Sequence, residues 1–319
     1  MATRITRKKA EKEAELPKAE TPAQEKKAAG LPLNFLKKSA GNSAENQVLL
    51  ANCEVYTSSE FQSMKERFVK AYEALTKTSA PVVNVTPEAL LSFLQDGKFK
   101  SFGECGQTKG DPDFEQRLDY TKRTYGYEDL KCCEKYGTIP VEEVNKESPI
   151  HGIPLEKRFC SRYGSVQLRL KPEVGSRTSL NVLDSGHQWG LDGSWKTHGF
   201  GWLFPVPYRT DKPEGFVGCL MSVPCPNEIA GLKETSPRAE RIRESIRLRN
   251  EKLLQVLEGK DPRDYVEAHV HGDIVPEDVA EIVFVPGCVK DFPEWKEVEK
   301  AAARYNIAVK AFTFIGIDE

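Results

Sequence analysis

One stretch constrains the fold of this chain more than any other, because it alternates strictly between apolar and polar side chains. It occupies residues 265–272 and reads Y-V-E-A-H-V-H-G. Successive side chains on a β-strand point to opposite faces. One face therefore carries Val266, Ala268 and Val270, and the other carries Tyr265, Glu267, His269 and His271. The pattern predicts a strand with an apolar face toward the core and a carboxylate and two imidazoles gathered on the opposite face, where Glu267 would reach a cleft open to solvent.

Apolar periodicity divides much of the remaining chain into helices first and strands later. Apolar residues recur at spacings of three and four between Ser59 and Lys77, which predicts a helix. A second helix is expected from the N-cap Thr86 to Gly97, and the longest from Ser236 to about Leu257. Alternating segments at 162–170 and 177–183 predict strands. Helices followed by strands, with one long helix between the strands, indicate the α+β class.

Three other segments are assigned from the same local patterns. The charged stretch after Gly106 is rich in turn-forming residues as far as Tyr127. Residues 294–305 have helical spacing, and residues 308–315 have the pattern of a last strand. Residues 31–36 form a short apolar segment, which is a candidate for docking onto the folded core.

The first 45 residues have the composition of a flexible, charged tail. Residues 1–30 hold eight Lys or Arg against five Glu, lack aromatic residues, and are interrupted by Pro17 and Pro22. Such a segment buries too little apolar surface to offset the entropy of ordering it. We therefore expect residues 46–319 to form a single domain and the tail to be dispensable for folding. The alternative is a basic arm that touches a nucleic acid or a partner.

Composition argues against a membrane protein and against a disulfide framework. The formal net charge is −2, and the sequence contains no apolar run close to the roughly 20 residues that a membrane span needs. Residues 1–9 lack the apolar core of a secretory signal. None of the eight cysteines forms a C-x-x-C pair, which favours reduced thiols. We expect a cytoplasmic protein, or one delivered into a target cell without a classical signal peptide.

Several blocks between about residues 90 and 290 resemble a bacterial family of unknown function. The most specific block is the last, where that family carries Y-I-E-A-x-V-H-G and this chain carries Y-V-E-A-H-V-H-G. Lys100 and His151 stand where the family has an arginine and a tyrosine. The other matching blocks are residues 99–106, 148–152, 162–165, 177–179 and 184–185.

The order of these blocks is also similar to that of the ADP-ribosyltransferase fold. This resemblance implies a core of two small packed β-sheets with flanking helices. Enzymes of that fold carry an Arg or His on an early strand, Ser or Thr on a middle strand, and a catalytic Glu on a late strand. The corresponding residues here are Arg162 or His151, then Thr178 and Ser179, then Glu267.

The same resemblance implies a binding site for NAD. His151-Gly152 is similar to the His-Gly that opens the NAD site in one branch of the fold, and Tyr163 would stack on nicotinamide. The residues implied for NAD binding are His151, Gly152, Arg162, Tyr163, Thr178, Ser179 and His269. Because no G-x-G-x-x-G follows a predicted strand, NAD would not bind as it does to a Rossmann domain.

The resemblance predicts an ADP-ribosyltransferase or an NAD glycohydrolase that needs no metal. Cleavage of the nicotinamide–ribose bond develops positive charge on the sugar, and a fixed carboxylate stabilises that state. The expected acceptor of ADP-ribose is a macromolecule, either protein or nucleic acid. By analogy with bacterial transferases the expected role is that of a toxin or effector, with an antitoxin or immunity protein as a further partner.

Two other functions use the same residues differently. His269, His271 and Asp273 are spaced as metal ligands and, together with His151, His187 or His198, would make a metal-dependent hydrolase. A binding module with a degenerate pocket is the non-enzymatic alternative. In structural terms, Glu267 is equally compatible with a buried ion pair, and His269 with a hydrogen-bonded core histidine.

Overall fold

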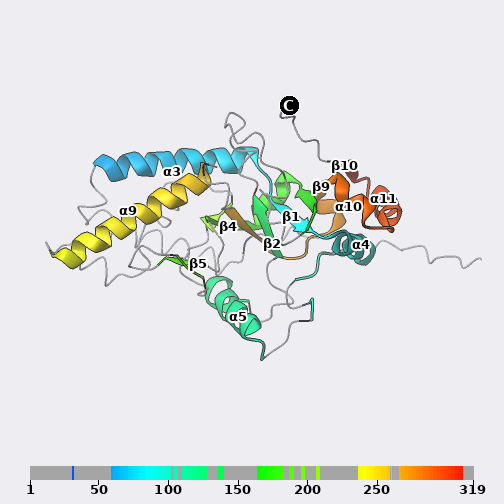
Figure 1. Ribbon diagram of the computed structural model, residues 1–319, viewed down its shortest axis with the longest axis horizontal. Helices are drawn as coiled ribbons and strands as arrows, with labels where there is room; N and C mark the ends of the chain where they lie inside the picture. Colours follow the sequence, from blue (N-terminus) through cyan, green and yellow to red (C-terminus); the bar gives the residue numbers. More distant parts are fainter. Residues whose placement is uncertain are drawn as a thin grey trace, which may run out of the picture.

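A computed structural model of the chain is centred on an eight-stranded β-sheet, with long helices at one end and short helices at the other (Figure 1). The structure describes residues 31, 59–101, 104–106, 110–127, 135–139, 164–182, 187–189, 195–197, 206–208, 236–258, 260 and 266–311. The α+β class expected from the order of helices and strands is confirmed.

The described strands form two sheets. The large sheet has the order β10-β9-β3-β1-β2-β8-β4-β7. Its members are β1 (Val82–Val85), β2 (Lys135–Ile139), β3 (Val166–Leu170), β4 (Thr178–Val182), β7 (Val206–Pro207), β8 (Val266–Val270), β9 (Val279–Phe284) and β10 (Ala308–Ala311). The small sheet pairs β5 (His187–Trp189) with β6 (Trp195–Thr197).

The large sheet consists of two halves that meet at a short junction. Strands β1 and β2 are joined by the single register pair Val82↔Thr138, whereas β1 and β3 align over four pairs and β2 and β8 over five. The described junctions are antiparallel except for β9–β10, which is parallel. One half is thus β10-β9-β3-β1, and the other is β2-β8-β4-β7.

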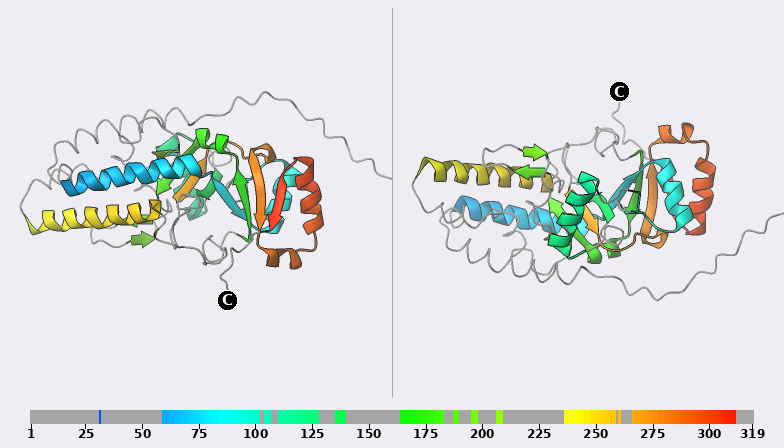
Figure 2. Two further views of the ribbon diagram at one scale, coloured as in Figure 1. Left: turned by 90° about the horizontal axis from the view of Figure 1, so that it is seen from above. Right: turned by 90° about the horizontal axis from the view of Figure 1, so that it is seen from below.

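Two long helices, α3 (Ser59–Thr78) and α9 (Pro237–Leu257), lie side by side and project from the β4 end of the sheet (Figures 1 and 2). The middle of α3 is joined to the end of α9 by an ion pair, in which Arg67 Nη2 lies 2.8 Å from Oε1 of Glu258, the residue after α9. The buried side chains of α3 recur at helical spacing and are Phe61, Met64, Phe68, Ala71, Tyr72 and Leu75. The helix expected from the apolar spacing of residues 59–77 is confirmed.

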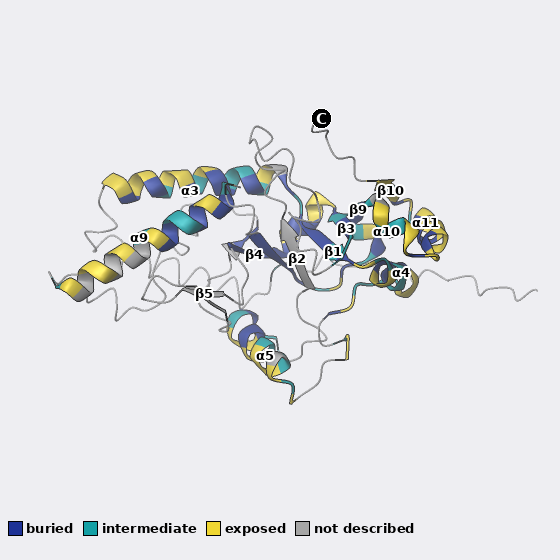
Figure 3. Cartoon of the chain, in the orientation of Figure 1, coloured by how far each residue is buried: buried dark blue, intermediate teal, exposed yellow. Residues whose placement is uncertain are grey.

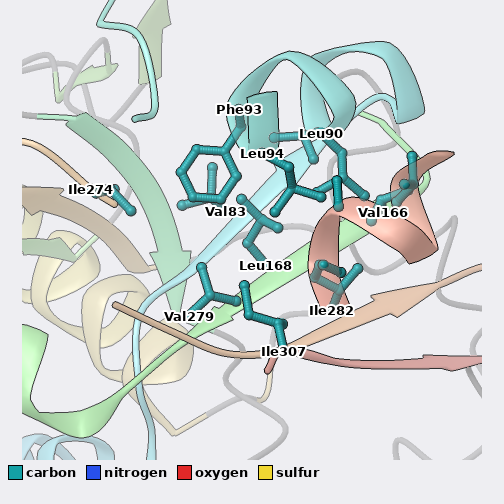
Figure 4. Close-up of a cluster of buried hydrophobic side chains, with 14 of the residues drawn as sticks. Val83, Leu90, Phe93, Leu94, Val166, Leu168, Ile274, Val279, Ile282 and Ile307 are labelled. Atoms are coloured by element: carbon teal, nitrogen blue, oxygen red, sulfur yellow. The ribbon is translucent and has the colours of Figure 1, made fainter. Parts of the chain in front are cut away.

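A hydrophobic core cluster lies against the other half of the sheet. Helices α4 (Pro87–Asp96) and α11 (Trp295–Arg304) pack against each other and contribute to this core, and the short helix α10 (Pro286–Lys290) lies beside them (Figure 1). Figure 4 shows how the apolar side chains of these helices meet those of the strands. The labelled residues are Val83, Leu90, Phe93, Leu94, Val166, Leu168, Ile274, Val279, Ile282 and Ile307.

Local capping signals fix both ends of α4 and the start of α9, as the sequence predicts. The hydroxyl of Thr86 accepts a hydrogen bond from the Ala89 amide at 3.3 Å. Gly97 closes the helix in the left-handed conformation, with φ of 70°. Helix α9 begins at Pro237, directly after Ser236, whose carbonyl accepts a hydrogen bond from the amide of Glu240.

The charged stretch before Tyr127 differs from the prediction of turns. It contains a helix, α5 (Pro112–Tyr125), which begins where Asp111 precedes proline. Proline at the first helical position has no amide to leave unpaired, so this signal was present in the sequence. The helix has low mean hydropathy, which hides its apolar face, yet Tyr120 and Tyr125 on it are buried.

Candidate functional site

The predicted polar face of β8 lies in the middle of one half of the sheet. In register, β4 places Ser179 opposite His269 and Asn181 opposite Glu267. On the other side, β2 places Thr138 opposite Glu267. Residues directly opposite each other on paired strands share a face. The carboxylate therefore has the polar Asn181 beside it on β4.

Both faces of β8 are buried, which corrects the expectation of a carboxylate open to solvent. Val266, Ala268 and Val270 are fully buried, and Glu267, His269 and His271 are 7%, 0% and 1% exposed. The cover over the polar face is aromatic, because Tyr120 and Tyr125 of α5 and the following Tyr127 make ring contacts with the two histidines. Figure 3 shows β4 and part of α5 in the buried colour.

A chain of short contacts links the two histidines through hydroxyl groups. The Tyr125 hydroxyl lies 3.0 Å from Nδ1 of His269 and 3.0 Å from Oγ of Ser179. Oγ of Ser179 lies 3.0 Å from Nε2 of His271, and Nδ1 of that ring lies 3.0 Å from the Tyr127 hydroxyl. These distances are those of hydrogen bonds. The histidines are thus members of one buried polar network.

Glu267 adjoins this network at its His269 end. Its Oε2 lies 3.0 Å from Nε2 of His269, which is an ion-pair distance, although the direction is not that of a linear hydrogen bond. The side chain of His269 is fully buried, whereas 10% of the Glu267 side chain remains exposed. The carboxylate is therefore held against a buried imidazole while part of it stays in contact with solvent.

Asn181 adds a second acceptor to the same face. Its Nδ2 donates to the Tyr120 hydroxyl at 3.3 Å. Its Oδ1 is buried and, among the described residues, has no hydrogen-bond partner. A buried acceptor left unpaired costs stability, so such an atom in a native structure points to a donor supplied from outside the described residues.

Arg177 fixes the end of β8 to the neighbouring strand. Its Nη1 donates to the carbonyl oxygen of His271 at 2.7 Å, and its Nη2 pairs with Oδ2 of Asp278 at 2.7 Å. The amide of His271 donates in turn to the Arg177 carbonyl at 2.9 Å. The backbone that carries the histidines is thereby held from two directions.

The residues predicted for NAD binding have separate outcomes. Ser179 and His269 come together in the network, beside Glu267. Thr178 lies on the opposite face, paired in register with Val270, and its hydroxyl donates to the Val174 carbonyl at 2.8 Å, within the 3-10 helix η3 (Pro172–Arg177) that precedes β4. The physical reason is the alternation of the strand, because adjacent residues cannot share a face. His151, Gly152, Arg162 and Tyr163 lie outside the described residues.

The tyrosines of the network were not among the predicted site residues. Tyr120, Tyr125 and Tyr127 fall in the stretch assigned to turns, about 140 residues before β8. The Asp111-Pro112 start signal and the tyrosines spaced along one helix could have indicated an aromatic face. Its partner strand could not be identified from the sequence.

The histidine rings are not arranged as metal ligands. Their nitrogens face Glu267, Tyr125, Ser179 and Tyr127. Asp273 is exposed. In the part of the chain that the structure describes, no group of three or more His, Cys, Asp or Glu lies close enough to hold a metal ion. His187 is on β5, whose side chains are not described, and His198 lies outside the described ranges.

No protein-family model matches this sequence, and neither does any curated protein. Within the described residues, no helix combines the length and the apolar character that crossing a bilayer requires.

The stability of the protein should depend on pH through His271. Burial, with smaller contributions from His269 and Arg177, holds the pKa of His271 well below its ordinary value of 6.5. The unfolded chain therefore takes up this proton first as the pH falls. We expect stability to decrease below about pH 6.5, by at most about 1.4 kcal/mol per pH unit for this one proton. Urea unfolding of the parent chain and of His271→Gln between about pH 5 and 7 measures it, and equal pH slopes would contradict this assignment.

Leu31, which lies in the predicted tail, packs against the buried pair Tyr120 and Tyr125. We expect removal of residues 1–30 to leave the melting temperature unchanged, because that segment lacks apolar side chains in a core pattern. Removal of residues 1–39 also deletes Leu31 and should lower the melting temperature by about 2–4 °C, for a loss near 1 kcal/mol. Two truncations with the same melting temperature would show that Leu31 does not contribute to stability.

Proposed function

We propose that this chain is an ADP-ribosyltransferase that uses NAD as a substrate and Glu267 as its catalytic carboxylate. The observation that supports this most is the position of Glu267. It lies in the middle of a sheet, 3.0 Å from a buried histidine, and 10% of its side chain is still exposed. A carboxylate fixed by a rigid strand meets the requirement for electrostatic stabilisation of a cationic transition state.

The chemistry needs a negative charge that does not have to reorganise. As the bond between nicotinamide and ribose breaks, the sugar acquires oxocarbenium character. A carboxylate placed in advance stabilises this charge more than water would, because the surrounding side chains exclude solvent. In this chain the aromatic cover over β8 supplies that exclusion.

The neighbouring polar groups would hold the sugar. The buried Oδ1 of Asn181 lies on the face of Glu267 and is an acceptor that a ribose hydroxyl could satisfy. Ser179 and His269 line the same face. The roles inferred for His151, Gly152, Arg162 and Tyr163 remain predictions, because these residues lie outside the described ranges.

The acceptor of ADP-ribose is expected to be a macromolecule, either a protein or a nucleic acid. A toxin or effector role, with an antitoxin or immunity protein as partner, follows from the analogy with bacterial transferases. Hydrolysis of NAD is the same reaction with water as the acceptor.

The experiment is incubation of the purified full-length chain with NAD that carries a label on its adenosine. Nicotinamide release measures cleavage, and the fractions of label in protein, nucleic acid and free ADP-ribose identify the acceptor. A chelator arm and elemental analysis run alongside. Absence of nicotinamide release with every acceptor would overturn the proposal, and stoichiometric zinc that is lost in His269→Ala would favour the metal-dependent hydrolase instead.

A further inference from the structure

The contacts around His269 form an ordered chain that ends at the proposed catalytic carboxylate. From one end of the network to the other, the contacts join Tyr127, His271, Ser179, Tyr125, His269 and Glu267, each at 3.0 Å. The interior members are buried, whereas Tyr127 is half-buried and Glu267 keeps part of its surface exposed. Polar residues from α5, β4 and β8, distant in sequence, thus meet in one line.

The direction of these hydrogen bonds follows from Glu267, the group at one end of the network. A nitrogen lone pair 3.0 Å from a carboxylate oxygen would be repelled, so Nε2 of His269 carries a proton. With that proton on Nε2, Nδ1 accepts from the Tyr125 hydroxyl. A hydroxyl has one proton, so Tyr125 accepts from Ser179 in turn.

The hydrogen bonds at the Tyr127 end of the network are assigned in the same way. Ser179 has donated its proton to Tyr125, so it accepts one from Nε2 of His271. With Nε2 protonated, Nδ1 of the neutral His271 accepts from the Tyr127 hydroxyl. The hydrogen bonds from Tyr127 to His269 therefore all run in the direction of Glu267, and Nε2 of His269 then lies 3.0 Å from its carboxylate without a linear hydrogen bond. Hydrogen bonds aligned in this way polarise one another.

We propose that Tyr125 is a positioning residue, whose hydroxyl fixes the His269 ring so that its Nε2 stays against the Glu267 carboxylate, 3.0 Å from Oε2, and keeps that carboxylate ionised and oriented for NAD cleavage. This inference rests on the proposed function, since it gives Tyr125 a role in that reaction. Tyr125 reaches the site from α5 and is 2% exposed, and its ring contacts both His269 and His271. Its hydroxyl links His269, the histidine next to Glu267, to Ser179 and the rest of the network.

The test compares Tyr125→Phe with a matched tyrosine elsewhere. Phenylalanine keeps the ring and removes the hydroxyl. Tyr305→Phe is the control, because its hydroxyl, at the end of α11, donates to the Leu94 carbonyl of α4 at 3.3 Å, away from β8. The readouts are the ring-nitrogen resonances of ¹⁵N-labelled histidine in the substrate-free protein, kcat and KM for NAD, and the pH dependence of kcat. Histidine substitutions assign the resonances of the five histidines.

We expect protonated Nε2 and hydrogen-bonded Nδ1 at His269 in the parent chain. In Tyr125→Phe the Nδ1 resonance should move toward that of a free acceptor nitrogen. The kcat should fall about tenfold, as expected for one lost hydrogen bond, with KM unchanged. The acid limb of the pH profile should move to higher pH, since the ionised carboxylate loses support. Among the described residues, the titratable groups that contact His269 are Glu267, Tyr120 and Tyr125, with His271 acting on it through charge, and Tyr125 is the one changed.

Two failures are distinguishable. If a folded, active Tyr125→Phe has an unchanged Nδ1 resonance and an unchanged acid limb, the positioning role is overturned and the proposed function stands. If the parent chain releases no nicotinamide, the proposed function is overturned, while the spectrum still decides the hydrogen bond because it needs no substrate. If Tyr125→Phe does not fold, Ser179→Ala breaks the next link and should shift the same resonance in the same direction by a smaller amount. If Ser179→Ala left the Nδ1 resonance of His269 unchanged, the proposed series of hydrogen bonds would be overturned.

Discussion

Glu267→Gln should release nicotinamide about 10²–10³-fold more slowly than the parent chain, the loss expected when a preorganised electrostatic group is removed. Glutamine keeps the shape of the side chain and its capacity for hydrogen bonding but removes the negative charge that would face the ribose. Because the side chain is almost buried and lies 3.0 Å from His269, the substitution should also cost about 1–2 kcal/mol of stability. Nicotinamide release and thermal unfolding, measured on the same preparations, separate the two effects.

The matched control is Glu281→Gln on β9. Glu281 is also a paired carboxylate on a strand of the same sheet, with Arg169 Nη1 at 2.9 Å and Lys310 Nζ at 2.6 Å. It lies in the other half of the sheet, so its loss should leave turnover unchanged. A folded Glu267→Gln with turnover equal to that of Glu281→Gln would remove Glu267 from the mechanism. A Glu267→Gln chain that does not fold would show that the carboxylate is mainly a structural partner of His269.

Gly164→Ala should be among the most destabilising single substitutions in the chain. Gly164 precedes β3 with φ of 130°, a conformation that residues with a side chain rarely adopt. A Cβ built there would lie 2.1 Å from the carbonyl carbon and oxygen of Val85 on the adjacent strand β1. Backbone on a central strand cannot move aside without disrupting the register of Val85 with Val166. We expect a loss of more than about 4 kcal/mol in the free energy of unfolding.

Gly287→Ala is the control for this substitution. Gly287 is in α10, and a Cβ added there meets no heavy atom within 4 Å. Because alanine favours a helix more than glycine does, we expect no loss and a gain of up to about 1 kcal/mol. Urea unfolding followed by circular dichroism measures both variants. If Gly164→Ala were as stable as Gly287→Ala, the close approach of residue 164 to β1 would be contradicted.

The alternative functions make different predictions at the same residues. A metal-dependent hydrolase would lose activity with a chelator and would not need the Tyr125 hydroxyl. A binding module would show no turnover of NAD in either the parent chain or Glu267→Gln. The parent chain, Glu267→Gln and Tyr125→Phe together therefore distinguish the three functions.

Local patterns in the sequence determined the ends and the faces of the regular elements. The spacing of Phe61 to Leu75 predicts α3, and Thr86, Pro87 and Gly97 predict both ends of α4. The alternation from Val266 to Val270 predicts which side chains share a face of β8. These features can be deduced because helix and strand periodicity and capping depend on residues a few positions apart.

The tertiary structure alone decided what covers those faces. Alternation places Glu267 and His269 on one side of β8, but it does not say that Tyr125, 144 residues away from His269, closes over them. It also does not say that β4 lies beside β8, or that Thr178 turns away while Ser179 joins the network. The physical reason is that the sequence of a strand specifies only one of the two surfaces that meet at each of its faces. The partners of its polar face are chosen by packing between distant segments, and that packing converted an expected open cleft into a buried network with Glu267 at its margin.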